Sequence, residues 1–229
     1  EHMDYERVNE LTGAQGTTSL SVWVPGLGAT WRIAEGVTLF GGMHRGFAPP
    51  RVEDAINTSG GTVDLDAELS WNQELGVRAQ FGTDVELELT AFRMRFENQI
   101  VPSSVAGGVG ADLTSAGETL HQGLEALANL RHPVSPGLTL NARLAWTWLP
   151  EARFLNTRCS AQVTTTCISV TGNRLPYAPE NLGTLTLGLA GRSWRAQVEG
   201  VYTDAMYTDD LNTLPIAANG QRGHMPAHL

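Results

Sequence analysis

Residues 138–148 read Leu-Thr-Leu-Asn-Ala-Arg-Leu-Ala-Trp-Thr-Trp, and this stretch decides the fold. Every second position from Leu138 to Trp148 is apolar, and most of the positions between them are polar. Alternate residues of a β-strand point to opposite faces of the sheet, so this pattern predicts a strand with one apolar and one polar face. A soluble sandwich would bury the apolar face, whereas a membrane barrel would turn it toward lipid, and alternation alone does not separate the two.

The same alternation recurs along the chain, at 69–81, 85–91, 184–189 and 194–202. Segment 120–132 also fits a helical stripe of leucines, and only its neighbours and the short turn after it favour a strand. We expect about ten strands, which lie near residues 1–9, 21–33, 37–47, 68–81, 85–98, 118–132, 138–149, 178–190, 194–207 and 223–229.

The links between these segments alternate between very short and very long. The short links lie at 34–36, 82–84, 135–137 and 191–193, and the long ones around 10–20, 48–67, 100–116, 151–175 and 208–222. Outer-membrane barrels join their strands by short periplasmic turns and long outer loops, whereas a sandwich has no reason to place all tight turns on one side. Aromatic residues also gather near both strand ends, as in a membrane girdle: Trp31, Phe81 and Trp194 beside tight turns, and Trp23, Trp71, Trp146, Trp148 and Tyr202 toward long links.

We therefore predict an all-β fold, an antiparallel up-and-down transmembrane β-barrel. A complete barrel must close, and Leu229 ends the sequence only a few residues into the last expected strand, so we interpret the barrel as incomplete, a portion of a larger one. Two alternatives are a complete small outer-membrane barrel that acts as a passive pore or adhesin, and a soluble secreted β-sandwich binding module.

The composition narrows the function. The chain has 229 residues and a net charge of −9, which argues against nucleic-acid binding because that needs basic patches. It has no apolar run of about 18 residues, so no transmembrane helix is expected. Catalytic motifs such as Gly-x-Ser-x-Gly, His-Glu-x-x-His and a phosphate-binding glycine loop are absent, and we predict no enzyme and no cofactor.

The acidic residues and cysteines of the sequence do not form a recognisable metal site. Asp204, Asp209 and Asp210 lack the ordered spacing of a calcium loop, so we expect a solvated acidic loop. Cys159 and Cys167 lie in the longest link, without the nearby histidines that a metal site would need. We expect them to form a local disulfide in an oxidising compartment, the alternative being two free thiols.

Four strings of residues carry a family resemblance. They are Leu-Phe-Gly-Gly-Met-His-Arg-Gly-Phe-Ala-Pro-Pro-Arg at 39–51, Gly-Glu-Thr-Leu-His-Gln-Gly-Leu-Glu at 117–125, Arg-Leu-Pro-Tyr-Ala-Pro-Glu at 174–180, and Tyr-Thr-Asp-Asp-Leu-Asn-Thr at 207–213 followed by Ala-Asn-Gly-Gln at 218–221. In this order, at strand-length intervals, they resemble TonB-dependent outer-membrane receptors of the ferric-citrate and siderophore type. The resemblance covers nearly the whole chain.

The resemblance implies a location, an activity and partners. Residues 1–229 would be the C-terminal portion of such a barrel, without its plug domain and final strands, in the bacterial outer membrane. The whole receptor would import a ferric chelate, a siderophore or ferric citrate, with energy from the inner membrane through a TonB-type transducer that contacts the missing N-terminal part. The sequence does not name the chelate.

The alternation also predicts which side chains face the lumen, and these include His44, His121, Glu125, Arg143 and Glu199. Receptors of this class bind the chelate at the outer lumen and loops, and such ligands are usually anionic, so arginine and histidine are their natural partners. The candidate ligand-binding residues are His44, Arg51, His121 and Arg174.

Three arginines point the other way by the same alternation. Arg45, Arg93 and Arg95 lie near the outer ends of their strands and would face the membrane, whose lipid and lipopolysaccharide are expected partners. They could pair with lipopolysaccharide phosphates there, or a β-bulge could reverse the alternation and turn them inward.

Overall fold

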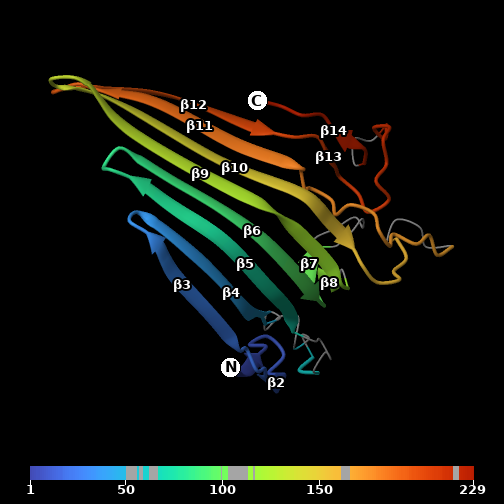
Figure 1. The fold of residues 1–229 in the computed structure, drawn as a ribbon. Coiled ribbons are helices and arrows are strands. Elements are labelled where there is room, and N and C mark those ends of the chain that lie inside the picture. Colours follow the sequence, from blue (N-terminus) through green and yellow to red (C-terminus); the bar gives the residue numbers. More distant parts are fainter. Residues whose placement is uncertain are drawn as a thin grey trace.

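One antiparallel sheet of eight strands dominates the computed structural model, which describes residues 1–49, 56, 59–61, 67–98, 100–102, 113–115, 117–160, 166–218 and 222–229. The strands follow the order β12-β11-β10-β9-β6-β5-β4-β3. Their bounds are β3 (Gly26–Ala34), β4 (Val37–Ala48), β5 (Glu68–Phe81), β6 (Val85–Glu97), β9 (Thr119–Ser135), β10 (Leu138–Phe154), β11 (Asn181–Ala190) and β12 (Arg195–Thr203). We call this sheet the wall, and Figure 1 shows it as one twisted layer.

The wall has the predicted up-and-down topology. Tight turns join β3 to β4, β5 to β6, β9 to β10 and β11 to β12, and all of them lie at one end of the wall, opposite the long loops (Figure 1). Gly36, Gly82 and Gly137 in these turns have φ values of 72°, 60° and 87°, which glycine adopts without steric cost. Segment 120–132, which also fitted a helix, is a strand within β9. The fold-class prediction is confirmed, and the wall stays open, with β3 and β12 as its edges.

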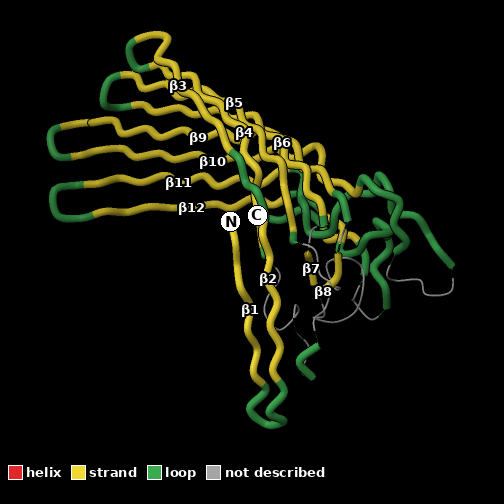
Figure 2. Tube along the Cα trace, turned by 90° about the horizontal axis from the view of Figure 1, so that it is seen from below, coloured by secondary structure: helices red, strands yellow, loops and turns green. Residues whose placement is uncertain are grey.

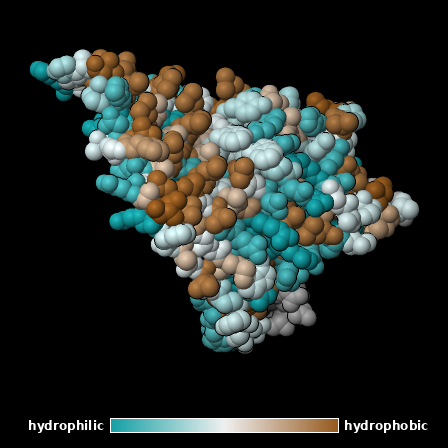
Figure 3. Space-filling model, viewed as in Figure 1, coloured by the Kyte–Doolittle hydropathy of each residue, from teal (hydrophilic) through white to brown (hydrophobic). Residues whose placement is uncertain are grey.

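The apolar face of the wall is not covered by a second layer, which rejects the sandwich alternative for the described residues. Cross-strand register aligns apolar side chains in rows on this outer face, for example Leu39, Val77, Leu89, Ala126 and Trp146. Leu75 is 67% exposed and Val198 is 66% exposed, as a lipid-facing surface requires. Figure 3 shows apolar side chains mainly over the strands toward the tight turns, and polar ones toward the loops.

The expected strand at 1–9 does not join the wall, and the region around 10–20, expected to be a long link, contains most of a second strand. β1 (His2–Val8) and β2 (Gln15–Ser21) pair with each other in a separate hairpin, which Figure 2 shows projecting away from the wall. The expected strand at 21–33 is therefore wrong as one element, because residues 22–25 belong to no strand and separate β2 from β3. Pro25 in this gap has no N–H for the ladder.

The expected strand at 223–229 is also wrong in extent. Only β14 (His224–Met225) forms there, paired with β13 (Met206–Tyr207) and not with an edge of the wall. His228 adds a single bridge to Thr203, at the end of β12. The remaining short strands, β7 (Ile100–Pro102) and β8 (Leu113–Ser115), pair with each other.

Buried apolar residues lie mostly outside the middle of the wall. One cluster consists of Ala152, Phe154, Val170 and Leu175 at the loop end, and a second joins Tyr5 of the hairpin to Ile56. The described residues include no helix of the length and apolarity that a membrane crossing needs. Within the described residues, the larger of the two buried apolar clusters therefore lies at the loop end.

Candidate ligand-binding site

A row of inner-face positions crosses the wall near its loop end. The register aligns Gly26, His44, Asn72, Met94, His121 and Ala152 from β3 to β10. Two of the predicted ligand residues, His44 and His121, thus lie at one height, three strand spacings or about 14 Å apart. His44 is exposed, His121 is partly buried, and Arg51 lies outside the described residues.

His121 has an aromatic neighbour and a free ring nitrogen. Its imidazole meets the Phe96 ring edge to face, with 5.3 Å between the ring centroids. Its Nδ1 has no hydrogen-bond partner within the described part of the chain. A buried nitrogen without a partner is costly unless another group satisfies it, so His121 can accept a contact from a ligand in the lumen.

The sequence analysis missed an apolar strip beside His121. Phe92, Met94 and Phe96 occupy successive inner-face positions of β6, and the ring of Phe92 lies above Gly123 of β9. A Cβ at Gly123 would collide with the Trp148 carbonyl oxygen and come within 3.1 Å of Phe92 Cζ, so the glycine makes room for the backbone of β10 and for the ring. The signal was present in the sequence, because the apolar positions of β6 change parity after Ala91.

No β-bulge produces this change of parity. The ladders of β5 with β4 and β6 run without a register shift, so Arg45, Arg93 and Arg95 do point outward. A shift occurs instead in β10, between Trp148 and Glu151. It turns Phe154 to the inner side, where the loops cover it.

Arg174 forms a β-bridge with Arg153 near the end of β10, and its guanidinium donates hydrogen bonds to main-chain carbonyls. Its Nε donates to the carbonyl of Ala178 at 2.7 Å, Nη2 to that of Leu149 at 2.6 Å, and Nη1 to that of Pro150 at 3.2 Å. Burial lowers the pKa of the guanidinium, and the Glu180 carboxylate acts in the opposite direction. The structure therefore gives Arg174 a role in holding the backbone, and its contact with a ligand stays a prediction.

Residues 152–160, 166–178 and 204–213 pack into one unit, which we call the loop assembly. Phe154 is 1% exposed and Val170 is 0% exposed within it. Asn212 joins its two halves, because the side-chain amide accepts from Arg174 N and donates to Arg174 O, both at 2.8 Å. Tyr177 N donates to Tyr207 O at 2.8 Å. Two of the strings that carried the family resemblance, 174–180 and 207–213, are thus in direct contact.

Two aspartates of the loop assembly correct the expectation of a solvated acidic loop. Asp209 is 1% exposed and Asp210 is 0% exposed. Asp209 Oδ1 accepts from the Thr213 hydroxyl at 3.0 Å, and Asp210 Oδ1 accepts from the Ser160 hydroxyl at 2.7 Å. Asp209 thus stabilises its own turn, and Asp210 links residues 204–213 to the segment that contains Ser160. Across the described ranges, no group of three or more His, Cys, Asp or Glu residues is arranged to hold a metal ion.

Cys159 and Cys167 are joined by a disulfide, with their Cα atoms 4.9 Å apart. The bridge ties the base of a small hairpin, in which Ser160 N donates to Ile168 O and Val170 N donates to Arg158 O. The hydrogen bond from Ser160 to Asp210 connects this cross-linked segment to residues 204–213. Burial lowers the pKa of Arg158, and Asp210 opposes this shift.

Comparison with known proteins agrees with this architecture. The family described as "TonB dependent receptor-like, beta-barrel" matches residues 1–224. Among solved structures, the unliganded ferric citrate transporter FecA is 21% identical with a TM-score of 0.68, and the match covers 99% of this chain and 32% of that one. The siderophore receptor PiuA from Acinetobacter baumannii is 16% identical with a TM-score of 0.60, over 94% of this chain and 29% of that one.

A further similar structure is the ferric yersiniabactin uptake receptor FyuA from Yersinia pestis, 16% identical with a TM-score of 0.59, over 94% of this chain and 30% of that one. At these identities the structures show a common fold, and the chain spans about a third of their length. The family match extends over nearly the whole chain. This protein belongs to the TonB-dependent receptor β-barrel family, whose members are bacterial outer-membrane proteins.

Proposed function

We propose that this chain forms one sector of the barrel of an outer-membrane receptor that imports a ferric chelate, a siderophore or ferric citrate. The observation that carries the proposal is the family match over residues 1–224. Energy for transport would come from the inner membrane through a TonB-type transducer that contacts a plug domain outside this chain. The ferric citrate, siderophore and yersiniabactin receptors among the similar structures support an iron chelate as the cargo class.

The open edges of the wall support the idea of a sector. β3 and β12 each have a wall neighbour on one side only. Unpaired N–H and C=O groups are costly in a bilayer, which is why membrane barrels close. Further strands of the same receptor would pair with both edges, enlarge the lumen and leave room for a plug.

The inner-face row and the loop assembly would form part of the chelate site. His44 and His121 lie about 14 Å apart on one row. A bound chelate could contact both imidazoles through its organic part, so that neither imidazole would need to coordinate the iron. Phe92, Met94 and Phe96 would supply apolar contacts between them. The loop assembly stands at the end of β10, next to His121 through Ala152, and would cover the ligand from outside.

Transport in iron-restricted cells tests this function. A strain without the receptor gene is compared with one that expresses the whole receptor, with radioactive iron supplied as citrate, hydroxamate or catecholate chelate. We expect receptor-dependent uptake of at least one chelate, and loss of that uptake when the TonB-type transducer is deleted. Uptake that persists without the transducer would favour a passive pore, and an absence of uptake for every chelate would reject the proposal.

A histidine pair tests the site. We expect the His44→Ala/His121→Ala receptor to bind the transported chelate about tenfold more weakly, because it loses two hydrogen-bonding side chains of roughly 0.5–1.5 kcal/mol each. His132→Ala is the matched control, since His132 lies at the tight-turn end of β9 beside Asp84, 3.5 Å away. Equal binding by the double variant and the control would remove His44 and His121 from the site.

A further inference from the structure

Polar residues interrupt the apolar outer face of the wall at one height. One cross-strand row consists of Met43, Gln73, Arg93, Gln122 and Glu151, and the next row toward the loops consists of Arg45, Trp71, Arg95, Leu120 and Arg153. We call these two rows, with Glu97 and Glu118 above them, the outer belt. It crosses β4, β5, β6, β9 and β10 in a continuous line.

The outer belt lies at the boundary of the apolar surface. The row directly below it toward the tight turns is Gly41, Leu75, Ala91, Leu124 and Trp148, without a charged residue. Because long loops mark the outer side of such barrels, the belt sits at the height of the outer-leaflet headgroups. An arginine costs only about 0–1 kcal/mol at that height, against about 2–4 kcal/mol at the bilayer midplane.

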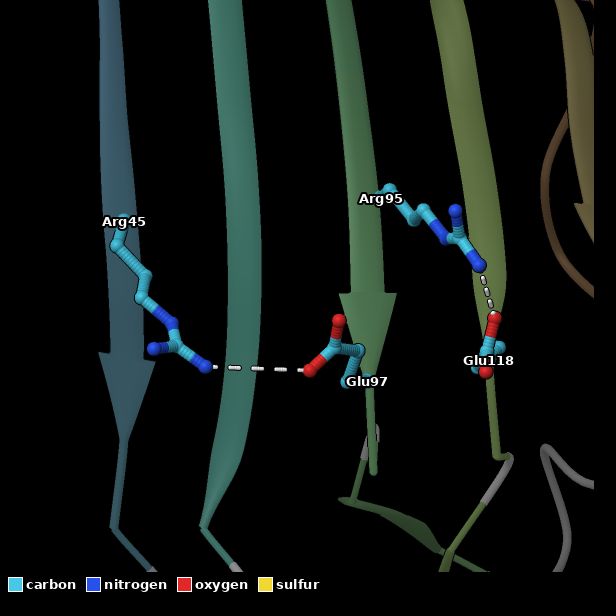
Figure 4. A network of polar contacts seen from close by, with 4 residues as sticks. All are labelled: Arg45, Arg95, Glu97 and Glu118. Carbon is cyan, nitrogen blue, oxygen red and sulfur yellow. Dashed lines mark hydrogen bonds and ion pairs between the residues drawn. The ribbon is translucent and has the colours of Figure 1, made fainter. Parts of the chain in front are cut away.

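The arginines of the belt differ in their partners (Figure 4). Arg95 is paired closely with Glu118 at 2.6 Å, whereas Arg45 is paired loosely with Glu97 at 3.9 Å and lies 5.9 Å from the centre of the Trp71 ring. Arg93 lies on β6 one outward position below Arg95, in the middle of the lower row, and makes no ion pair or hydrogen bond with any described residue. The belt thus has a free guanidinium at its centre and a loosely held one beside it.

A groove opens on the same face below Arg93. It has a volume of about 490 Å³, with Arg93, Gln73 and Gln122 at its polar end. The rest of its lining is mainly apolar and includes Leu75, Ala91, Leu124 and Trp148, with Glu74, Phe92, Gly123 and Pro150 completing it. A cation above an apolar groove matches a lipid that carries an anionic headgroup and an acyl chain.

We propose that the outer belt binds lipopolysaccharide, with a phosphate on Arg93, further phosphate contacts to Arg45 and Arg95, and an acyl chain in the groove. Lipopolysaccharide occupies the outer leaflet and carries several phosphates and acyl chains on one molecule, so it can engage several arginines and the groove together. The chain has no lysine, so all of its permanently charged basic residues are arginines, and a guanidinium binds phosphate in a bidentate manner. This site is on the opposite face from the inner-face row and does not depend on the identity of the imported chelate.

Lipid-dependent thermal stabilisation of the whole receptor tests the proposal. The receptor is purified in mild detergent, stripped of lipid, and heated with increasing lipopolysaccharide or, separately, phosphatidylglycerol. We expect lipopolysaccharide to raise the unfolding temperature of the wild type, and Arg93→Gln to need about tenfold more of it, since one charge-assisted contact is lost. Phosphatidylglycerol should stabilise both proteins weakly and equally.

Two further variants make the outcome decisive. Arg45→Gln/Arg93→Gln should shift the midpoint of the response further than the single variant, and Arg143→Gln, on the inner face, should respond like the wild type. If Arg93→Gln responds to lipopolysaccharide as the wild type does, the site is rejected. If phosphatidylglycerol stabilises the wild type as well as lipopolysaccharide does, the belt recognises anionic lipid in general and the proposal is also overturned.

Discussion

The wall and the loop assembly differ in how far their apolar side chains are exposed. Leu75 and Leu89 of the wall are 67% and 45% exposed, whereas Phe154 and Val170 of the loop assembly are 1% and 0% exposed. The difference follows from the solvent. Hydrocarbon covers the outer face of the wall, so its apolar side chains need no protein partner, whereas the loops stand in water and must build a core of their own.

The largest expected effect separates these two kinds of packing. Phe154→Ala should destabilise the loop assembly by about 3–5 kcal/mol, because it loses buried area and leaves a cavity among Val170 and Leu175. Leu89→Ala in the wall should cost less, because lipid fills the space and no cavity remains. Denaturant titration of the receptor in detergent, with limited proteolysis of the loops as a second readout, measures both. Equal losses in the two variants would contradict the comparison.

A charge at two heights of the wall should show the next largest effect. Leu144 lies in the middle of the apolar rows, opposite Ala128 and Leu185, and Leu144→Arg should cost about 2–4 kcal/mol. Gln73→Arg, within the outer belt, should cost only about 0–1 kcal/mol. Folding into lipid vesicles, followed by urea unfolding, measures the difference. A similar cost at both positions would place the belt away from the membrane interface.

Alternation predicted the wall well because each strand carries its own pattern. The pattern at 138–148 predicted the outward face of β10 from Leu138 to Trp148. Gln73, the one polar residue among the outward positions of 69–81, belongs to the outer belt. Alternation could not predict the shift between Trp148 and Glu151, because a bulge depends on how two strands pair. It also did not identify β2, whose residues Gln15–Ser21 include a single large apolar side chain, and so it could not show that β1 pairs with β2 away from the wall.

The loop assembly was less predictable because its bonds join distant residues. The buried state of Asp210 depends on Ser160, 50 positions away, and the anchoring of Arg174 depends on Asn212, 38 positions away. Taken without the rest of the chain, the three acidic residues of 204–210 predict a solvated loop. The family resemblance identified both strings, but their contact appears only in three dimensions.

The disulfide should contribute to the loop assembly alone. Cys159→Ser/Cys167→Ser should destabilise it by roughly 2–3 kcal/mol, the loop-closure value for so short a cross-link. The wall should be unaffected, because the bridge lies outside its strands. Proteolysis of residues 155–178 measures the first effect, and heat-resistant migration of the barrel on a gel measures the second. A loss of barrel stability equal to the loss of loop protection would show that the two regions unfold together.

A smaller effect is expected where the two halves of the loop assembly meet. Asn212→Ala removes both hydrogen bonds to the main chain of Arg174 and leaves that N–H and C=O without their partner, a cost of about 1–3 kcal/mol. Ser169→Ala is a suitable control, because its hydroxyl makes only local contacts with Thr171. Faster cleavage in Asn212→Ala alone would support a role of these hydrogen bonds in holding the two halves together. The same cleavage rate in both variants would contradict that role.

The smallest effect should appear as a dependence on pH at the junction between the wall and the loops. Asp204, just after β12, accepts hydrogen bonds from Asn181 Nδ2 at 3.0 Å and from Ala205 N at 2.8 Å, and these bonds hold the pKa of its carboxyl below the ordinary value. A carboxyl with a lowered folded pKa stabilises the fold above its unfolded pKa of about 3.9, and this contribution is lost as the pH falls through the folded value. Asp204→Asn should therefore unfold at a lower temperature than the wild type at pH 7, and the difference should shrink once the pH drops below about 4. A difference that stays constant down to pH 2.5 would mean that the charge of Asp204 does not contribute.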